Sequence, residues 1–211
     1  MEQKNVSRNL LKRMPVYLNF LKSLPDDTVY ISAVAIANAL ELGSVMVRKD
    51  LAKVSSGGRR KLGYSRVNLI RDIEEFLNFS KPIDAVVLGA GRLGQALLDY
   101  HGFKDYGLNV RAGFDVREEL KSTAAGKPVY DLDLLGDFCT RYPVRIGIIT
   151  VPTQYAQDAC DRLVACGIKV IWNFTPVNLQ TPGDVVVQDE NLAESMTSMR
   201  MLIKESSATE E

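Results

Sequence analysis

The chain has 211 residues, of which 46% are hydrophobic and 25% charged, and its formal net charge at pH 7 is zero. This composition is typical of one or two globular domains, and no apolar run approaches the roughly 20 residues of a membrane-spanning helix. Three cysteines and one histidine argue against a disulfide framework and a histidine-based metal site. The first residues form no apolar signal segment, so we expect a cytoplasmic protein without membrane association.

The charge is divided unevenly along the chain. Residues 1–81 carry fourteen Lys and Arg against eight Asp and Glu, whereas residues 82–211 carry twelve against eighteen. Such asymmetry suggests two domains, the basic one facing a polyanion. Seven cations lie within 19 residues that contain one acid, Asp50: Arg48, Lys49, Lys53, Arg59, Arg60, Lys61 and Arg66. A solvated charged face explains such a cluster equally well, so the surrounding elements decide the interpretation.

The N-terminal segment begins with a predicted helix over 7–24, because apolar residues recur there at helical spacing. Pro15 lies inside this pattern and predicts a kink or a later start. A short extended piece follows at 29–31, and then a small helix over 33–40, which Ser32 caps.

A helix-turn-helix is predicted next. Glu41-Leu42-Gly43 forms the turn, and Ser44 caps a second helix over 45–54. Val47 and Leu51 lie four residues apart and are expected to face inward. The exposed positions of this helix would carry Arg48, Lys49 and Lys53.

The sequence after this helix predicts a basic hairpin. In Ser55-Ser56-Gly57-Gly58-Arg59-Arg60-Lys61-Leu62-Gly63-Tyr64, glycines flank three consecutive cations. A small hairpin of this kind inserts positive charge into a narrow minor groove, where negative potential is concentrated. Helix-turn-helix and hairpin together predict a winged helix; the alternative is a helical protein-interaction module with an accidental basic loop. A helix over 67–77 and a linker over 78–82 complete the segment.

The C-terminal segment opens with a dinucleotide-binding pattern. The apolar strand at 83–88 runs into Gly89-Ala90-Gly91-Arg92-Leu93-Gly94 and then into a helix over 95–100. Placed between a buried strand and a helix, this GxGxxG is a strong signal. Its three glycines permit, in order, the tight turn, close approach to a pyrophosphate, and tight helix–strand packing, while the helix N-terminus holds the phosphates.

A second strand over 108–114 ends at Asp115, 26 residues beyond Gly89. A carboxylate at this position bonds the ribose hydroxyls of NAD and repels a 2′-phosphate. Arg117, which follows Asp115 and Val116, would soften that repulsion or flank the adenine. We therefore favour NAD(H) over NADP(H) as the cofactor.

Further βα units predict a parallel, doubly wound sheet. They comprise a helix over 131–141, a strand over 145–150, a helix over 156–166 and a strand over 169–172. Ligands bind at the carboxyl ends of such strands. Four strand ends therefore converge on one expected site: Gly89–Gly94, Asp115, Thr150-Val151-Pro152-Thr153 and Asn173-Phe174. The alternative is a Rossmann shell that binds nothing.

The chain closes with a predicted strand over 184–187 and a helix near 191–204. Leu192, Met196, Met199 and Ile203 recur at helical spacing on that helix. This apolar stripe must be covered, either by its own domain or by another chain.

Groups for catalysis are scarce. A dehydrogenase needs a residue that moves a proton while hydride moves, and no acid/base cluster or substrate domain is evident. His101 is a lone candidate base and is more simply a solvated or structural side chain. Cys160 and Cys166 are expected to pack as small hydrophobes. We therefore expect a sensor that is not an enzyme and has no metal site.

These features resemble the Rex family of redox-sensing transcriptional repressors over residues 7–204. The stretches that carry the resemblance are Lys12-Arg13-Met14-Pro15-Val16-Tyr17, Val47-Arg48-Lys49-Asp50-Leu51, Gly63-Tyr64, Gly89–Gly94 with Asp99-Tyr100, Phe114-Asp115, Val151-Pro152 and Trp172-Asn173-Phe174-Thr175-Pro176-Val177. Each stretch alone is unspecific, but their combination and order are specific.

The resemblance implies an α/β fold in three parts: a winged helix-turn-helix domain over 1–80, a Rossmann-like NAD(H)-binding domain over 81–188, and a domain-swapped C-terminal helix and tail over 189–211. It implies a homodimer that binds palindromic operator DNA when NADH is low and that NADH closes and releases. The swapped helix would lie between the domains of the partner, which would account for the apolar stripe.

Two sets of site residues follow from the pattern and the resemblance together. The DNA-binding set is Ser44, Arg48, Lys49, Lys53, Arg59, Arg60 and Lys61. The cofactor-binding set is Gly89, Ala90, Gly91, Arg92, Leu93, Gly94, Tyr100, Asp115, Val116, Arg117, Thr150, Val151, Pro152, Asn173 and Leu192.

The chain departs from the family at three places. Ala52-Lys53-Val54-Ser55 stands where members usually carry Ser-Tyr-Phe-Gly, and Lys61 stands where the wing usually has glycine. Asn191-Leu192 stands where an Asp and an aromatic residue often approach the partner's nicotinamide. These departures concern the operator sequence and the strength of redox coupling.

Three functions are compatible with the sequence: an NADH-responsive repressor, an NAD-dependent oxidoreductase with a helical N-terminal appendage, and a DNA-binding or assembly protein with a vestigial nucleotide site. The basic hairpin favours the first and third over the second. The intact glycines with Asp115 favour the first over the third.

Overall fold

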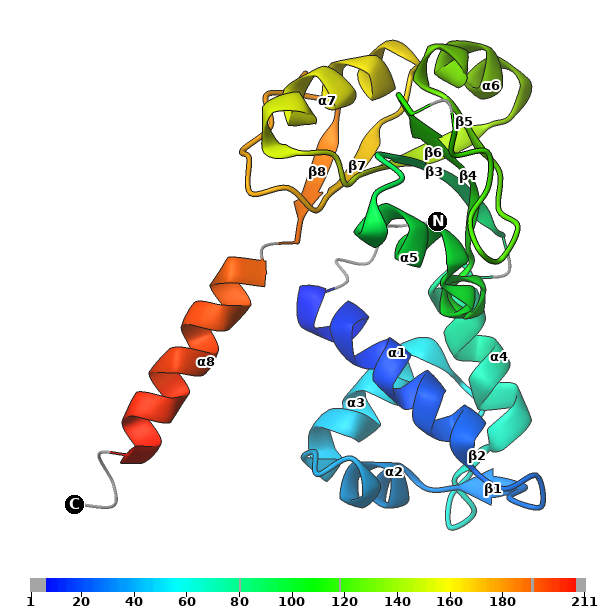
Figure 1. Cartoon of the computed structure of the whole chain (residues 1–211). Helices are drawn as coiled ribbons and strands as arrows, with labels where there is room; N and C mark the ends of the chain where they lie inside the picture. Colours follow the sequence, from blue (N-terminus) through cyan, green and yellow to red (C-terminus); the bar gives the residue numbers. More distant parts are fainter. Residues whose placement is uncertain (1–6, 80, 118, 191, 208–211) are drawn as a thin grey trace. The chain divides into compact units, whose positions relative to one another are not determined.

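The structure is a computed structural model that describes residues 7–79, 81–117, 119–190 and 192–207. The chain forms two compact units, Met1–Lys81 and Pro82–Glu211, which are described separately below (Figure 1).

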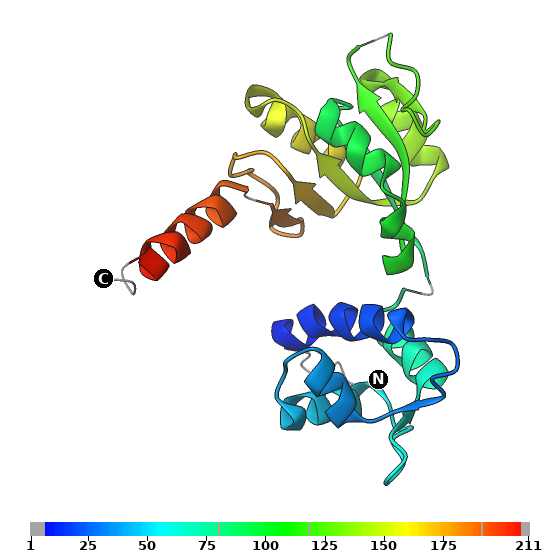
Figure 2. The same ribbon diagram turned by 60° about the horizontal axis from the view of Figure 1, so that its bottom comes forward.

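The described residues of the first unit form four helices and a two-stranded antiparallel sheet. Its elements in chain order are α1 (Arg8–Ser23), β1 (Tyr30–Ile31), α2 (Ala33–Ala39), α3 (Ser44–Val54), β2 (Tyr64–Ser65) and α4 (Arg66–Phe76). β1 pairs with β2 through Ile31 and Tyr64, which joins the two ends of the helix-turn-helix region. Figure 2 shows the helices of this unit from a second direction.

Apolar residues on all four helices meet in one core. Fully buried members include Met14, Tyr17, Ile36, Leu51 and Leu69. Ser7 caps α1 by accepting a hydrogen bond from the Leu10 N–H, and Ser32 caps α2 through the Ala35 N–H, as predicted for α2. α1 contains Pro15 in its interior, so a start after this proline is wrong.

The expected cap at Ser44 is wrong by one position. Gly43 is the N-cap of α3, because its carbonyl accepts the first bond of the helix from the Val47 N–H at 3.0 Å. Ser44 is therefore the first helical residue, and its hydroxyl makes no capping bond.

The second unit is built on a six-stranded parallel sheet. The strands are β3 (Ile83–Leu88), β4 (Leu108–Asp115), β5 (Val129–Asp131), β6 (Val144–Ile149), β7 (Val170–Asn173) and β8 (Val186–Asp189), in the spatial order β5-β4-β3-β6-β7-β8. Every neighbouring pair is parallel. This is the order of a dinucleotide-binding Rossmann sheet, whose switch point lies between β3 and β6, and the predicted α/β fold class is confirmed.

Helices cover both faces of this sheet. α5 (Arg92–Asp99) and the 3₁₀ turn η1 (His101–Tyr106) pack on the face formed by Ala85, Val87 and Val110. α6 (Leu135–Arg141) and α7 (Ala156–Ala165) pack on the opposite face, as Figure 1 shows. The short 3₁₀ turns η2 (Leu132–Leu134) and η3 (Thr153–Tyr155) precede α6 and α7. The last helix of the described residues is α8 (Leu192–Ser207).

Three expected elements start two or more residues from their predicted position. The last strand, predicted over 184–187, is β8 at Val186–Asp189. The helix predicted over 131–141 is shorter, because Val129–Asp131 pairs with β4 as an edge strand and η2 comes between it and α6. The helix predicted over 95–100 starts three residues earlier, at Arg92, directly after Gly91.

Candidate functional site

The first candidate site is the outer surface of α3. Val47 and Leu51 are fully buried, as predicted, and turn the opposite side of α3 outward. That side carries Arg48, Lys49 and Lys53, all exposed, while Ser44 is partly exposed at the start of the helix. An exposed row of cations on the second helix of a helix-turn-helix can contact a polyanion.

An ion pair to the buried Asp50 carboxylate joins α3 to α1. The Arg13 guanidinium donates to Asp50 through Nε–H at 2.7 Å and Nη2–H at 3.0 Å, and the Tyr17 hydroxyl donates to Oδ2 of the same carboxylate at 3.0 Å. Burial, and then the bond to Asp50, raise the pKa of Tyr17 to about 12. Two helical turns of α1 are thereby fixed to α3. The sequence does not predict this contact, because Asp50 lies 33 residues from Tyr17 and 37 residues from Arg13.

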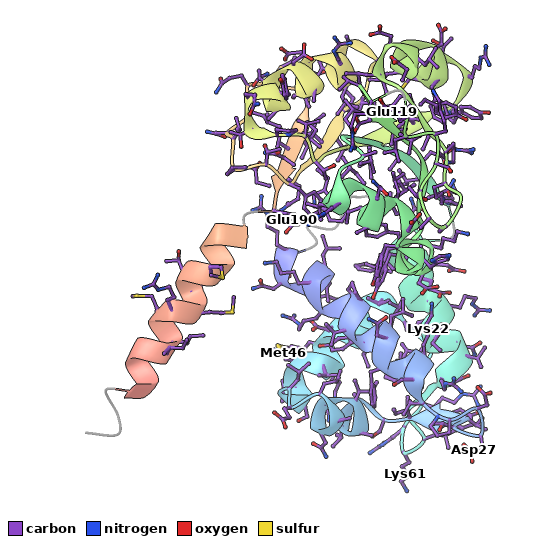
Figure 3. All side chains as sticks on the ribbon, viewed as in Figure 1. Lys22, Asp27, Met46, Lys61, Glu119 and Glu190 are labelled. Carbon is purple, nitrogen blue, oxygen red and sulfur yellow. The ribbon has the colours of Figure 1, made fainter. Side chains whose placement is uncertain are left out.

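The hairpin after α3 is formed as predicted. The Arg59 N–H donates to the Gly63 carbonyl at 2.8 Å, and the Gly63 N–H donates back to the Arg59 carbonyl at 2.9 Å. Arg59, Arg60 and Lys61 are exposed, and Lys61 has a φ of +68°, in the left-handed region that favours glycine. In Figure 3 the Lys61 side chain points away from the body of its unit. Arg59–Gly63 is called the wing below.

The segment before the wing and the last residue of the wing are both anchored. The Ser55 hydroxyl donates to Asp72 at 2.5 Å and accepts from the Gly57 N–H at 3.1 Å. Gly63 has a φ of +86°, and a Cβ there would lie 2.3 Å from the Ile31 carbonyl oxygen. The wing therefore leaves the unit in a defined direction.

One cation of the basic cluster has a structural role. Arg66 donates to the Leu21 carbonyl at 2.9 Å and the Pro25 carbonyl at 3.0 Å, and its side chain is 11% exposed. It joins α4 to the end of α1 and does not belong to the exposed cationic surface.

The second candidate site is the glycine-rich turn between β3 and α5. Gly89 has a φ of +93°, and a Cβ on Gly94 would lie 1.9 Å from the Gly89 carbonyl oxygen. A Cβ on Gly91, in contrast, would meet no atom within 4 Å. The first and third glycines are thus required by the fold, whereas the second borders open space at the N-terminus of α5.

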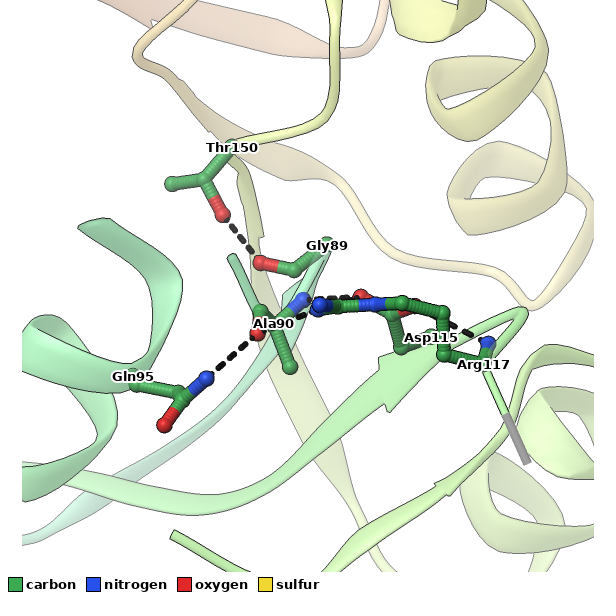
Figure 4. Close-up of polar contacts among 6 residues, drawn as sticks. All are labelled: Gly89, Ala90, Gln95, Asp115, Arg117 and Thr150. Carbon is green, nitrogen blue, oxygen red and sulfur yellow. Dashed lines mark hydrogen bonds and ion pairs between the residues drawn. The ribbon is translucent and has the colours of Figure 1, made fainter. Parts of the chain in front are cut away.

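The ends of three neighbouring strands meet at this turn (Figure 4). The Thr150 hydroxyl, just after β6, donates to the Gly89 carbonyl at 2.6 Å. Asp115, at the end of β4, accepts from the Ala90 N–H at 2.7 Å. Gln95 on α5 donates to the Ala90 carbonyl at 2.9 Å, a contact that the sequence did not predict.

Arg117 surrounds the Asp115 carboxylate. Its backbone N–H and its Nε–H donate to Oδ1 at 3.0 and 2.9 Å, and its Nη2–H donates to Oδ2 at 3.0 Å and to the Ala90 carbonyl at 2.7 Å. Burial of the carboxyl opposes its ionisation, but the bonds from Arg117 and Ala90 outweigh it, so the pKa of Asp115 is lowered.

These residues fit a dinucleotide. Free backbone space at Gly91, a helix N-terminus and a carboxylate at the end of the next strand are the groups that hold a pyrophosphate and a ribose. Arg92, Leu93 and Val116 are exposed beside them, with Val151 partly exposed and Pro152 exposed after β6.

Asn173 is close to this edge but is committed to the protein. Its side chain is fully buried; the amide donates to the Val177 carbonyl at 2.9 Å and to Asp189 at 2.8 Å, and its oxygen accepts from Thr175. It therefore shapes the loop that follows β7, and its direct contact with a cofactor stays a prediction.

Tyr100 is not brought to the glycine-rich turn. It caps the C-terminus of α5, the end opposite Gly91, and its ring meets Phe103 at 4.9 Å between centroids. It lines an apolar groove of about 390 Å³ with Ile83, Phe103, Tyr106, Gly107, Leu108, Ile146 and Trp172. Asn191 lies outside the described residues, as does the side chain of Leu192, so their expected roles stay predictions.

The residues expected to have no site chemistry are separate from both sites. His101 is exposed at the start of η1, Cys160 is fully buried in the core, and Cys166 caps α7. Within the described ranges, no three His, Cys, Asp or Glu side chains are grouped to hold a metal ion. No helix in the part of the chain that the structure describes is long and apolar enough to cross a membrane.

The geometry defines a class of protein: a helix-turn-helix unit with a basic wing, joined to a Rossmann unit with an intact dinucleotide fingerprint. Two family models match the chain, "Putative DNA-binding protein N-terminus" over residues 5–52 and "CoA binding domain" over residues 80–177.

Curated relatives match over almost the whole length. The redox-sensing transcriptional repressor Rex of Treponema denticola is 39% identical over 96% of this chain and 97% of its own. Rex of Clostridioides difficile is 33% identical over the same shares. The chain therefore belongs to the Rex family of redox-sensing transcriptional repressors, and the predicted repressor class, as opposed to an enzyme, is confirmed.

Solved structures agree with this assignment. The crystal structure of RSP with β-NAD⁺ and operator DNA is similar with a TM-score of 0.88 and 30% identity, covering 99% of this chain and 97% of RSP. The structure of RSP with β-NADH gives a TM-score of 0.82 at 30% identity, covering 99% of both chains.

Proposed function

We propose that this chain is a homodimeric repressor that binds operator DNA and releases it when NADH occupies the Rossmann unit. One observation carries the proposal: the same chain has two binding surfaces. The first is the exposed cationic side of α3 with the wing. The second is the glycine-rich turn, which has free space at Gly91 and the Asp115 carboxylate bonded to its Ala90 N–H. RSP, which this chain matches over 97–99% of its length, binds operator DNA with β-NAD⁺ and also binds β-NADH.

The DNA contacts are assigned to two surfaces. Arg48, Lys49 and Lys53, with Ser44, would contact the major groove and its phosphates from α3. Arg59, Arg60 and Lys61 would enter the minor groove, where cations are attracted most strongly. All six cations are exposed, so none must leave an internal ion pair to bind.

The cofactor contacts are assigned to the edge of the sheet at its switch point. The N–H groups at the start of α5 would hold the pyrophosphate near Gly91, and Asp115 would accept the ribose hydroxyls. Arg92, Leu93, Val116, Thr150, Val151 and Pro152 border that path. The dinucleotide would be NAD(H), because a 2′-phosphate would lie next to the Asp115 carboxylate.

Dimerisation is assigned to α8. Its described side chains Met196, Met199 and Ile203 are 59%, 52% and 65% exposed in the single chain. The apolar groove that Trp172 lines offers the C-terminal helix of a second copy a surface of matching chemistry.

We propose three functional parts: 1–80 for DNA, 81–188 for NAD(H), and 189–211 for the subunit contact. A regulator of this kind acts in the cytoplasm.

The test is a linked titration. An operator is first selected from random duplex DNA with the full-length protein, and its affinity is then measured by fluorescence anisotropy with increasing NADH or NAD⁺. We expect NADH to weaken DNA binding by about 5- to 150-fold, the usual range of allosteric coupling, and DNA to weaken NADH binding by the same factor. Equal DNA affinity with and without saturating NADH would refute the proposal.

A truncation tests the subunit contact. A chain that ends before Asp189 should be monomeric by light scattering, or dimeric with a DNA affinity that ignores NADH. A truncated protein that stays dimeric and responds fully to NADH would show that α8 is dispensable.

A further inference from the structure

The Asp115 carboxylate is fully occupied by the protein itself. Oδ1 accepts from the backbone N–H and the Nε–H of Arg117, and Oδ2 accepts from the Ala90 N–H and the Arg117 Nη2–H. Figure 4 shows the guanidinium beside this carboxylate. A carboxylate has about four lone-pair sites, so these four bonds leave none for a ligand.

Half of these bonds to Asp115 come from one partly exposed side chain. Two of the four bonds belong to the guanidinium of Arg117, and the other two come from backbone N–H groups. Removing the guanidinium would free one acceptor site on each oxygen, which is the number that the two hydroxyls of a ribose require. The Arg117 fork therefore occupies the positions that an adenosine ribose would take.

Release of the guanidinium leaves no buried polar group without a partner. The Arg117 side chain is 52% exposed and can extend into water, whereas the Asp115 side chain is 9% exposed and stays in place. The Ala90 carbonyl, which also accepts from Arg117, retains its bond from Gln95. The exchange of Arg117 for a ligand is thus a local rotation of one side chain.

We propose that Arg117 is a specificity-determining residue that competes internally with the ribose of the dinucleotide. The proposal rests on the cofactor site proposed above and adds which residue limits its affinity. The Arg117 fork binds Asp115, and a ribose diol displaces it.

The displaced guanidinium also changes the preference between dinucleotides. Because Arg117 is only two residues from Asp115, the released guanidinium can still reach a 2′-phosphate on the ribose and form a charge-assisted pair with it. Arg117 therefore weakens binding of NADH, which must displace it, and strengthens binding of NADPH, which can use it. Loss of the side chain must move the two affinities in opposite directions.

The experiment compares Arg117→Met with wild type, because Met keeps an unbranched apolar stem but has neither charge nor donors. Full-length protein without DNA is titrated with NADH and with NADPH, and binding is followed by the fluorescence of the reduced nicotinamide. We expect Arg117→Met to bind NADH about three- to tenfold more tightly, given the usual strength of a partly exposed ion pair with fork geometry. NADPH should bind more weakly by a similar factor.

Arg145→Met is the matched control, because Arg145 is also exposed but lies near the start of β6, at the opposite end of that strand from Thr150. It should leave both affinities unchanged. Arg117→Lys retains the positive charge but loses the guanidinium fork. We expect this variant to bind NADH more tightly than wild type and to keep most of the wild-type affinity for NADPH.

The outcomes separate this inference from the proposed function. A wild-type protein that binds neither dinucleotide would overturn both. NADH binding that Arg117→Met leaves unchanged, or affinities that move in the same direction for both dinucleotides, would overturn the role of Arg117 and leave the repressor proposal standing.

Discussion

The two units build their candidate sites from opposite materials. In Met1–Lys81 the groups available for binding are exposed cationic side chains, attached to a buried frame that includes Tyr17 and Asp50. In Pro82–Glu211 the central groups are backbone atoms, and the residues that shape them are glycines. Substitutions of the exposed cations should therefore weaken binding by the first unit without unfolding it. In the second unit, a methyl group added to a glycine should abolish either the fold or the binding of a ligand, depending on which glycine carries it.

The largest loss of stability is expected when a methyl group is added at Gly94 by Gly94→Ala. Ala in place of Gly inside a helix normally stabilises it by about 1 kcal/mol. At Gly94 the new Cβ would lie 1.9 Å from the Gly89 carbonyl, so we expect Gly94→Ala to reduce the free energy of unfolding of the second unit by about 3 kcal/mol. Urea unfolding followed by the fluorescence of Trp172, the single tryptophan, reports on this unit alone.

Gly91→Ala is the matched variant, because its Cβ would meet no atom within 4 Å. It should unfold at the same urea concentration as wild type but bind NADH at least about tenfold more weakly, since the methyl group stands where a pyrophosphate must approach. Equal stability of the two variants would contradict the division of roles among the glycines.

Substitutions in the wing should weaken DNA binding without lowering stability. Replacing Arg59, Arg60 and Lys61 with Ala removes three exposed charges, and each lost phosphate contact should lower the slope of log affinity against log salt by about 0.9. We expect operator affinity to fall by about 100-fold at moderate salt, with NADH binding and stability unchanged. Anisotropy titrations at several salt concentrations measure both quantities.

Three exposed cations of the second unit serve as the control: Lys121, Arg141 and Arg145. Their replacement changes the net charge equally and should leave the salt slope nearly unchanged. If this control lost as much affinity as the wing variant, DNA binding would follow from total charge and not from the wing.

The sequence predicted the features that depend on residue type at fixed spacing. The glycine turn, Asp115 at a strand end, the inward faces of Val47 and Leu51, and the basic hairpin are all of this kind, because backbone freedom or charge is a property of the residue itself. The parallel sheet followed from the alternation of strands and helices. The family resemblance added the expected homodimer and the domain-swapped C-terminal helix.

What the sequence did not predict depends on contacts across the fold. The edge strand at Val129–Asp131 is three residues long and has too little periodicity to detect. The inward turn of Arg66, the ion pair of Arg13 with Asp50 and the Arg117 fork each require knowing which backbone lies nearby. Residue type and spacing group Arg66 with the other cations of the basic cluster, and only the structure separates it from them by its bonds to the Leu21 and Pro25 carbonyls.

A smaller effect is expected at Asp115, where the second unit does use a side chain. Asp115→Ala removes the acceptor for the ribose and should weaken NADH binding by about tenfold, since hydrogen bonds to charged groups contribute roughly 1.5–3 kcal/mol. NADPH should suffer less, because Arg117 is then free to meet its phosphate. Because the pKa of Asp115 lies below its ordinary value, the wild-type affinity should be flat from pH 6 to 8.

Asp137→Ala, an exposed acid on α6, is the control for charge and should not change either affinity. Wild-type protein that prefers NADPH over NADH would refute the assignment of Asp115 as the residue that selects the cofactor.

The smallest effect concerns the frame beneath α3. Tyr17→Phe removes the hydrogen bond to Asp50 but leaves both bonds from Arg13, so at pH 7 we expect a loss of about 1 kcal/mol in the stability of the first unit. Burial, and then Asp50, raise the pKa of Tyr17 from 10 to about 12. The neutral phenol is thus favoured in the folded state, and its contribution is complete below pH 10 and is lost as the pH rises toward 12. Wild type should therefore lose stability faster than Tyr17→Phe above pH 10, and the gap between their free energies of unfolding should narrow.

Hydrogen exchange of the α3 amides, measured by mass spectrometry, reports the stability of the first unit, which the fluorescence of Trp172 does not report. A gap that stays constant up to pH 11 would show that the phenol of Tyr17 titrates alike in the folded and unfolded states, which would contradict the raised pKa that burial and Asp50 give it.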